Sequence, residues 1–143
     1  MRFMVLVKAS KESEAGVLPS KEEFAEMGQF NEQMIKAGVM LAGEGLQASS
    51  KGARINYSGE KPVVTDGPFT ETKELVAGFW LIQVKSKEEA IEWLKRAPFK
   101  EGEVEIRQVF EASDFPADIF PTEEAAAREQ ALREQLQRQY SKL

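Results

Sequence analysis

The pattern of apolar and polar positions predicts two similar halves, each with an apolar strand followed by a helix. Residues 3–7 (FMVLV) and 75–84 (LVAGFWLIQV) are runs typical of strands with apolar side chains on both faces. Residues 20–23 and 86–89 both read Ser-Lys-Glu-Glu, a capping-box signature that predicts the start of a helix. The apolar face of the first helix should carry Phe24, Met27, Asn31, Met34 and Ile35.

Shorter segments complete the predicted order. Residues 39–42 and 104–110 read as further strands, and residues 54–57 and 62–65 as a small hairpin, whereas residues 8–19 form a polar loop. The order strand, helix, strand, hairpin, strand, helix, strand predicts an α+β fold. It fits the ferredoxin-like split βαβ plan with an inserted β-hairpin.

The end of the chain has a different pattern. Residues 113–121 contain two prolines and read as a linker between a domain of residues 1–112 and a C-terminal helix of residues 122–143. The i,i+4 pairs Glu124–Arg128, Glu129–Arg133 and Glu134–Arg138 should each stabilise this extra helix by ~0.2–0.5 kcal/mol. Two interpretations stay open, a solvated helix lying on the body or an arm that grips a partner subunit.

Apolar residues on both faces of the two central strands have a consequence for assembly. Two helices cover one face of such a sheet, and the other face of an isolated antiparallel sheet is normally polar. Exposing four or five large apolar side chains would create a patch that soluble monomers avoid. We therefore expect a closed homodimer. The alternative is that the hairpin and the tail fold back over their own sheet.

Composition and charge exclude several classes of function. The net charge is −5, and no basic block is present, which argues against direct binding of nucleic acid. The sequence lacks Cys and His, so thiol catalysis, histidine acid–base chemistry and sites built on Cys or His ligands are excluded. Nothing supports a metal, nucleotide or flavin cofactor. No stretch approaches the length of a membrane span, and we expect a cytoplasmic protein.

Candidate site residues gather around Asp66-Gly67-Pro68-Phe69, a turn between two apolar strands. Asp66 is a candidate catalytic carboxylate or ligand anchor, with a turn-forming side chain as the alternative. Glu44 lies between two glycines at the end of a strand and is the second catalytic candidate. The ligand-binding candidates are Arg54, Asn31, Glu71 and Lys73. For Arg54, Glu71 and Lys73 the alternative is an ordinary surface charge. For Asn31 the alternative is a buried amide that needs a hydrogen-bond partner.

The signature at residues 65–74 resembles that of the YCII-related, DGPF-domain proteins. Gly43-Glu44-Gly45-Leu46, Gly78-Phe79 and residues 89–93 (EAIEW) are also similar to that family, over residues 1 to about 112. The resemblance implies a dimeric α+β barrel on a ferredoxin-like fold and, for some members, an association with extracytoplasmic-function sigma factors. Shorter relatives are thought to use a His–Asp pair. Because this sequence has no His, that mechanism does not carry over.

Two functions follow as hypotheses. The first is a domain that binds an unknown small molecule in an acidic cleft, with isomerase- or lyase-type acid–base chemistry centred on Asp66. The second is a non-catalytic regulatory or interaction module linked indirectly to a sigma factor.

Overall fold

The computed structural model describes residues 1–142, which divide into a compact unit of residues 1–109 and a second unit that begins at Phe110. The strands are β1 (Arg2–Lys8), β2 (Met40–Gly45), β3 (Ala53–Asn56), β4 (Val63–Asp66), β5 (Val76–Gln83) and β6 (Val104–Gln108). The helices are α1 (Lys11–Glu14), α2 (Lys21–Lys36), α3 (Lys87–Leu94) and α4 (Glu123–Tyr140). Three 3-10 turns are η1 (Ser49–Lys51), η2 (Thr72–Glu74) and η3 (Ala112–Asp114).

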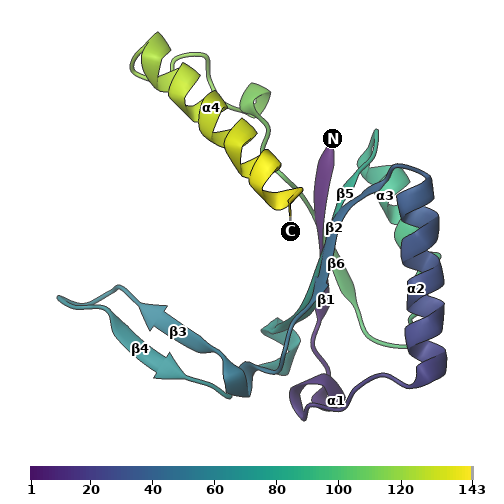
Figure 1. Cartoon of the computed structure of the whole chain (residues 1–143). Helices are drawn as coiled ribbons and strands as arrows, with labels where there is room; N and C mark the ends of the chain where they lie inside the picture. Colours follow the sequence, from purple (N-terminus) through teal and green to yellow (C-terminus); the bar gives the residue numbers. More distant parts are fainter. Residues whose placement is uncertain (143) are drawn as a thin grey trace. The chain divides into compact units, whose positions relative to one another are not determined.

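The first unit is an α+β domain built on a four-stranded antiparallel sheet. The strand order is β2-β5-β1-β6, so the two most apolar strands, β1 and β5, are the central pair. Helices α2 and α3 lie on the same side of this sheet (Figure 1). The β3–β4 hairpin is a separate two-stranded sheet that extends away from it (Figure 1).

Both Ser-Lys-Glu-Glu signatures begin helices, each through its serine N-cap. The Ser20 side chain accepts a hydrogen bond from the Glu23 amide at 3.1 Å, and Ser86 does the same for Glu89 at 3.1 Å. The predicted polar loop before α2 contains a further single turn, α1, which Ser10 caps. The sequence reading missed this turn because Ser13, rather than Glu or Gln, completes its capping box.

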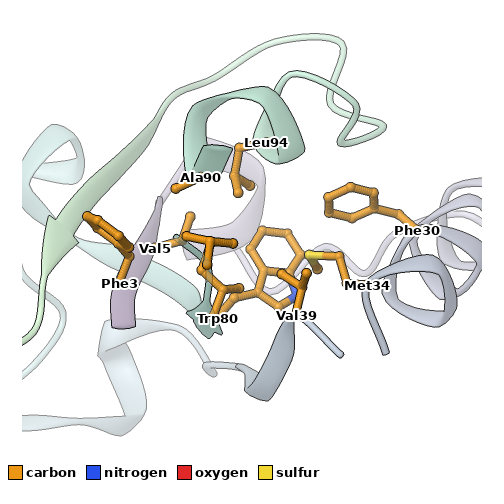
Figure 2. Packing of buried hydrophobic residues seen from close by; sticks show 10 residues of the cluster. Phe3, Val5, Phe30, Met34, Val39, Trp80, Ala90 and Leu94 are labelled. Atoms are coloured by element: carbon orange, nitrogen blue, oxygen red, sulfur yellow. The ribbon is translucent and has the colours of Figure 1, made fainter. Parts of the chain in front are cut away.

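The core lies between the sheet and the two helices (Figure 2). Its members are buried, and they are Phe3, Val5, Phe30, Met34, Val39, Trp80, Ile82, Val84, Ala90 and Leu94. The stripe predicted for α2 is partly wrong, because Phe24 and Ile35 are exposed whereas Phe30 is buried. Ile35 follows the buried Met34 directly, so it lies about 100° further round the helix and points away from the core.

A tryptophan fixes α2 to the sheet. The Trp80 indole N–H donates to Asn31 Oδ1 at 2.9 Å, and the Phe30 ring meets the indole edge-on with ring centroids 5.7 Å apart. Gly43 lies opposite Trp80 in β2, where an added Cβ would come within 2.7 Å of the indole Cδ1. The glycine therefore leaves the space that the ring fills.

The opposite face of the sheet is also apolar at its centre, as the sequence predicts. We call Met4, Leu6, Phe79 and Leu81 the outer face; they alternate with buried residues along β1 and β5 and are half-buried. No helix of residues 1–109 covers this face (Figure 1).

Charged residues flank the outer face. Glu44 and Glu105 stand at the two ends of the row that contains Phe79 and Leu6. Lys8 Nζ lies 3.4 Å from Glu105 Oε1, and Arg107 Nη1 lies 3.4 Å from Glu105 Oε2. These two cations lower the pKa of Glu105, chiefly through the hydrogen bond from Lys8.

The second unit contains α4, which Thr122 caps by accepting a hydrogen bond from the Ala125 amide at 3.0 Å. One predicted ion pair forms, with Arg133 Nε 3.0 Å from Glu129 Oε1. Within residues 110–142 the other two predicted pairs are not formed; Glu134 instead accepts a hydrogen bond from Gln130 at 3.2 Å.

Candidate functional site

The Asp66-Gly67-Pro68-Phe69 signature docks onto η1. The Gly67 amide donates to the Gly52 carbonyl at 3.0 Å, and the Phe69 amide donates to Ser49 Oγ at 3.0 Å. The Gly67–Pro68 peptide bond is cis. A Cβ at Gly67 would lie 1.7 Å from the Ser49 carbonyl oxygen, so only glycine allows this approach of two backbones.

Glu14 connects this turn to α1. Its Oε2 accepts the Ser49 amide at 3.0 Å, and its Oε1 accepts the Ser49 hydroxyl. The two hydrogen bonds lower the pKa of Glu14, with the hydroxyl bond as the larger cause. Ser49 thus joins α1 and the signature, which are far apart in the sequence. The sequence carries no signal for this contact, because neither Glu14 nor Ser49 stands in a recognisable motif.

Asp66 is the last residue of β4 and is exposed. In the described part of the chain, its side chain makes no hydrogen bond or ion pair, and Ser49 binds the Phe69 amide that a turn-forming Asp66 could have bound. Its cross-strand neighbour is Ala53, so Asp66 and Arg54 lie on opposite faces of the hairpin.

The other candidates are spread over four elements. Arg54 stacks on the Phe69 ring, with its guanidinium carbon 3.8 Å from the ring centroid. Glu44 lies on the outer face, while Glu71 and Lys73 are exposed at η2. Asn31 is half-buried and accepts the Trp80 indole N–H, so its amide has the partner that the sequence led us to expect. The structure therefore pairs Arg54 with the signature, but it does not join Asp66, Glu44 and Arg54 in one cleft within residues 1–142.

A cleft of about 450 Å3 lies elsewhere, between α1 and the loop that leads from α3 to β6. Its apolar lining consists of Val7, Ala9, Ala77, Phe99 and Val104. Its charged lining consists of Lys8, Lys11, Glu12, Glu101 and Glu103, so acids outnumber bases by one. We call this the α1 cleft. Sequence reasoning missed it because residues 7–13 and 99–104 are distant in the chain and carry no motif.

Two valines that line the α1 cleft belong to a row of the sheet that ends in two glycines. Val7 and Val104 face each other in neighbouring strands, and the same row continues through Gly78 to Gly45. Half of this row therefore has no side chain. The apolar cluster ends at the row, with Phe99 meeting the Trp80 ring at a centroid distance of 6.0 Å.

The family of the chain is shown by comparison with known proteins. The family model of the YCII-related domain matches residues 1–113 of this chain. The chain belongs to the YCII-related family. An uncharacterised protein of Rhizobium meliloti (strain 1021) is 32% identical over 95 residues, which are 62% of this chain and 77% of that protein. Membership of the narrower DGPF group stays a prediction.

Two further properties bear on the site of this YCII-related protein. Among residues 1–142, none of the helices has both the length and the apolar character that crossing a bilayer requires. In the same residues, acidic side chains do not assemble into a group of three or more that could hold a metal ion.

Proposed function

We propose that this YCII-related protein binds a small molecule in the α1 cleft. The observation that carries this proposal is the cleft itself, whose volume of about 450 Å3 lies in the range of roughly 300–1,000 Å3 that ligand sites occupy. An apolar lining with charged residues around it suits a ligand that has an apolar body and a polar end.

Thermal-shift screening against a metabolite library tests this proposal. A ligand that binds the folded chain at about 100 times its Kd stabilises it by ~2.7 kcal/mol and raises its melting temperature. The variant Ala9→Trp fills the cleft and should abolish the shift, whereas Asp66→Asn should retain it. If Asp66→Asn abolished the shift and Ala9→Trp did not, the ligand would lie at the signature and the cleft proposal would be wrong.

We further propose a homodimer on the ferredoxin-like plan. The order β2-β5-β1-β6 and the two helices on one face support that plan. The outer face supports the dimer, because burying each of its large apolar side chains is worth ~1.5–3 kcal/mol. Sedimentation equilibrium should show a dimer that Leu81→Glu dissociates and that Ile35→Glu, on the exposed surface of α2, leaves intact. A monomeric wild-type chain would refute the dimer.

Catalysis of the isomerase or lyase type at Asp66 is a narrower proposal. A carboxylate base needs a basic neighbour and shelter from water, and within one copy Asp66 is exposed. A second copy that covered the base of the hairpin would supply the shelter. Any turnover found with a ligand from the screen should be lost in Asp66→Asn, and unchanged turnover would remove this role.

A non-catalytic interaction module is the second candidate function. The observation that favours it is the hairpin, in which every residue from Ser50 to Asp66 is exposed. Its link to sigma-factor-dependent transcription rests on the family association. Deletion of the gene should then abolish such transcription. If complementation with the Ala9→Trp variant restored it, the result would support the module and argue against ligand binding in the cleft.

A further inference from the structure

We propose that Glu14 is a positioning residue of the α1 cleft, and that the signature turn acts on the cleft through it. Glu14 ties α1 to Ser49, and Ser49 is bound in turn by the signature. We call the contact between Glu14 and Ser49 the clasp. This inference rests on the proposed binding of a small molecule in the α1 cleft, and it links that site to residues 66–69, which do not line it.

Helix α1 forms part of the wall of the cleft. Residues 10–13 line it together with residues 101–104. Glu14 is the last residue of the helix and turns its carboxylate to Ser49, outside the lining. Any shift of α1 would therefore change the width of the cleft, although Glu14 itself does not reach into it.

Burial of side chains does not hold α1 in place. None of its four residues is buried, and Val17 and Leu18, which follow it, are 60% and 84% exposed. A single helical turn is not stable in water by itself. The position of α1 must therefore depend on its contacts with the rest of the chain.

Hydrogen bonds supply these contacts at both ends of α1. Directly before the helix, the Ala9 amide donates to the Leu75 carbonyl at 2.9 Å. Beyond Ala9, in the part of the chain that the structure describes, the hydrogen bonds from residues 10–19 to another element are the two of the clasp. The backbone thus fixes the start of the helix, and the clasp fixes its end.

The signature determines where Ser49 lies. The Ser49 hydroxyl donates to Glu14 and accepts the Phe69 amide at 3.0 Å, so one side chain joins both partners. Gly67 packs directly against the Ser49 carbonyl oxygen, which an added Cβ would approach to 1.7 Å. A change in the signature that displaces Ser49 would therefore move Glu14 and α1 with it. Such coupling between two sites typically changes an affinity by about 5–150-fold.

Two adjacent serines provide a matched test. The probe is N-phenyl-1-naphthylamine, an uncharged dye whose fluorescence rises in an apolar site, and the part of its binding that Ala9→Trp removes reports the cleft. Ser49→Ala should raise the dissociation constant of that part about fivefold or more. Ser50→Ala, at the exposed neighbouring position, should leave it within about twofold of the wild type. Ser49→Thr keeps the hydroxyl and should restore the affinity.

A double-mutant cycle tests whether the two residues act as one contact. Glu14→Ala should weaken dye binding at least as much as Ser49→Ala. The double variant should bind no more weakly than Glu14→Ala alone, because both substitutions break the same contact. Additive effects of the two substitutions would contradict the clasp.

A substitution in the signature tests the longer link. Gly67→Ala should displace the Ser49 carbonyl and raise the dissociation constant of the dye, although Gly67 does not line the cleft. Gly59→Ala is the control in the β3–β4 connection, because a Cβ there would lie 3.8 Å from the Lys61 carbonyl oxygen, an ordinary contact distance. Equal affinities of these two variants would show that the signature does not act on the cleft.

Amide hydrogen exchange, followed by NMR below the melting temperature of every variant, tests α1 without a ligand. The Ala15 amide donates to the Lys11 carbonyl at 2.9 Å, and the Val17 amide donates to the Glu12 carbonyl at 3.0 Å. Both amides should exchange about tenfold faster in Ser49→Ala than in Ser50→Ala, because loss of the clasp allows α1 to open locally.

The outcomes separate this inference from the proposed function. If Ala9→Trp removed no part of the dye binding, the proposed function would be wrong, and this inference with it. If Ala9→Trp removed binding that Ser49→Ala and Glu14→Ala left unchanged, only the positioning role of Glu14 would be overturned. Faster exchange in α1 with an unchanged dye affinity would also overturn that role, because the clasp would then order the helix without shaping the cleft.

Discussion

The Glu14 side chain holds the signature turn to α1 through one serine. Its carboxylate accepts both the amide and the hydroxyl of Ser49, and Ser49 in turn accepts the Phe69 amide. A carboxylate that is hydrogen-bonded in the folded state has its pKa lowered there, as is the case for Glu14. The charged form of Glu14 therefore stabilises the folded chain.

This arrangement predicts a pH dependence of stability. Because the pKa of Glu14 is lowered on folding from its ordinary value of 4.5, its contribution is complete above that pH and is lost as the pH falls through the lowered value. Glu14→Gln should destabilise the chain at pH 7, and the difference from the wild type should shrink below about pH 4. Urea unfolding at several pH values measures this, with Glu12→Gln as the control; equal effects of the two variants would contradict it.

Gly43 and Gly45 provide a comparison within one strand. An added Cβ at Gly43 would lie 2.7 Å from Trp80 Cδ1 and 2.7 Å from Met40 Cε, whereas one at Gly45 would meet nothing within 4 Å. Because Asn31 and Phe30 hold the indole, Gly43→Ala should cost about 1–3 kcal/mol in the free energy of unfolding. Gly45→Ala should cost less. Similar denaturant midpoints for the two variants would show that the indole moves freely.

Helix α2 contains one glycine that packing does not require. Gly28 is exposed in the middle of the helix, and a Cβ there would meet nothing within 4 Å. Alanine reduces the conformational entropy of the unfolded chain, so Gly28→Ala should stabilise the protein by about 0.5–1 kcal/mol. Thermal unfolding measures the gain, and a lower melting temperature would reveal a contact that requires glycine at this position.

At the scale of elements, the sequence predicted what local patterns determine. The Ser-Lys-Glu-Glu signatures located both long helices of the first unit, because capping is a contact between residues three apart. The hairpin of residues 53–66 was also predicted, to within a residue at each strand. Helix α1 was missed, since Ser13 in place of Glu removes the usual signature.

The candidate site was less predictable than the fold. The α1 cleft brings residues 7–13 next to residues 99–104, and the Ser49–Glu14 contact joins residues 35 apart. Such contacts depend on how the elements pack and leave no periodic pattern. The roles proposed for Asp66, Glu44, Arg54, Glu71 and Lys73 stay predictions. Asn31 was expected to need a partner, but the sequence could not show that Trp80 is that partner.

At the scale of the whole molecule, the hydrophobic core belongs to one unit. All of its buried members lie between Phe3 and Leu94, and the unit boundary follows Val109. A chain that ends at residue 112 should therefore fold cooperatively, with a denaturant midpoint close to that of the full chain. Circular dichroism during urea unfolding measures this. Loss of the cooperative transition would mean that the C-terminal unit is part of the fold.

The same truncation decides between the two interpretations of α4. If the truncated chain keeps the association constant of the full chain in sedimentation, the helix does not grip a partner. A weaker association with an unchanged unfolding midpoint would assign the helix to the subunit contact.

Gly78 limits how the central sheet can vary. At Gly78 a Cβ would lie 2.9 Å from the Glu44 carbonyl oxygen, so a larger residue there would force the backbones of β2 and β5 apart. The spacing of these two strands is therefore set by main-chain geometry rather than by side-chain choice. Lys11 and Glu101 line the α1 cleft and are exposed, so substitutions there should alter the surface of the cleft with little change in the free energy of unfolding.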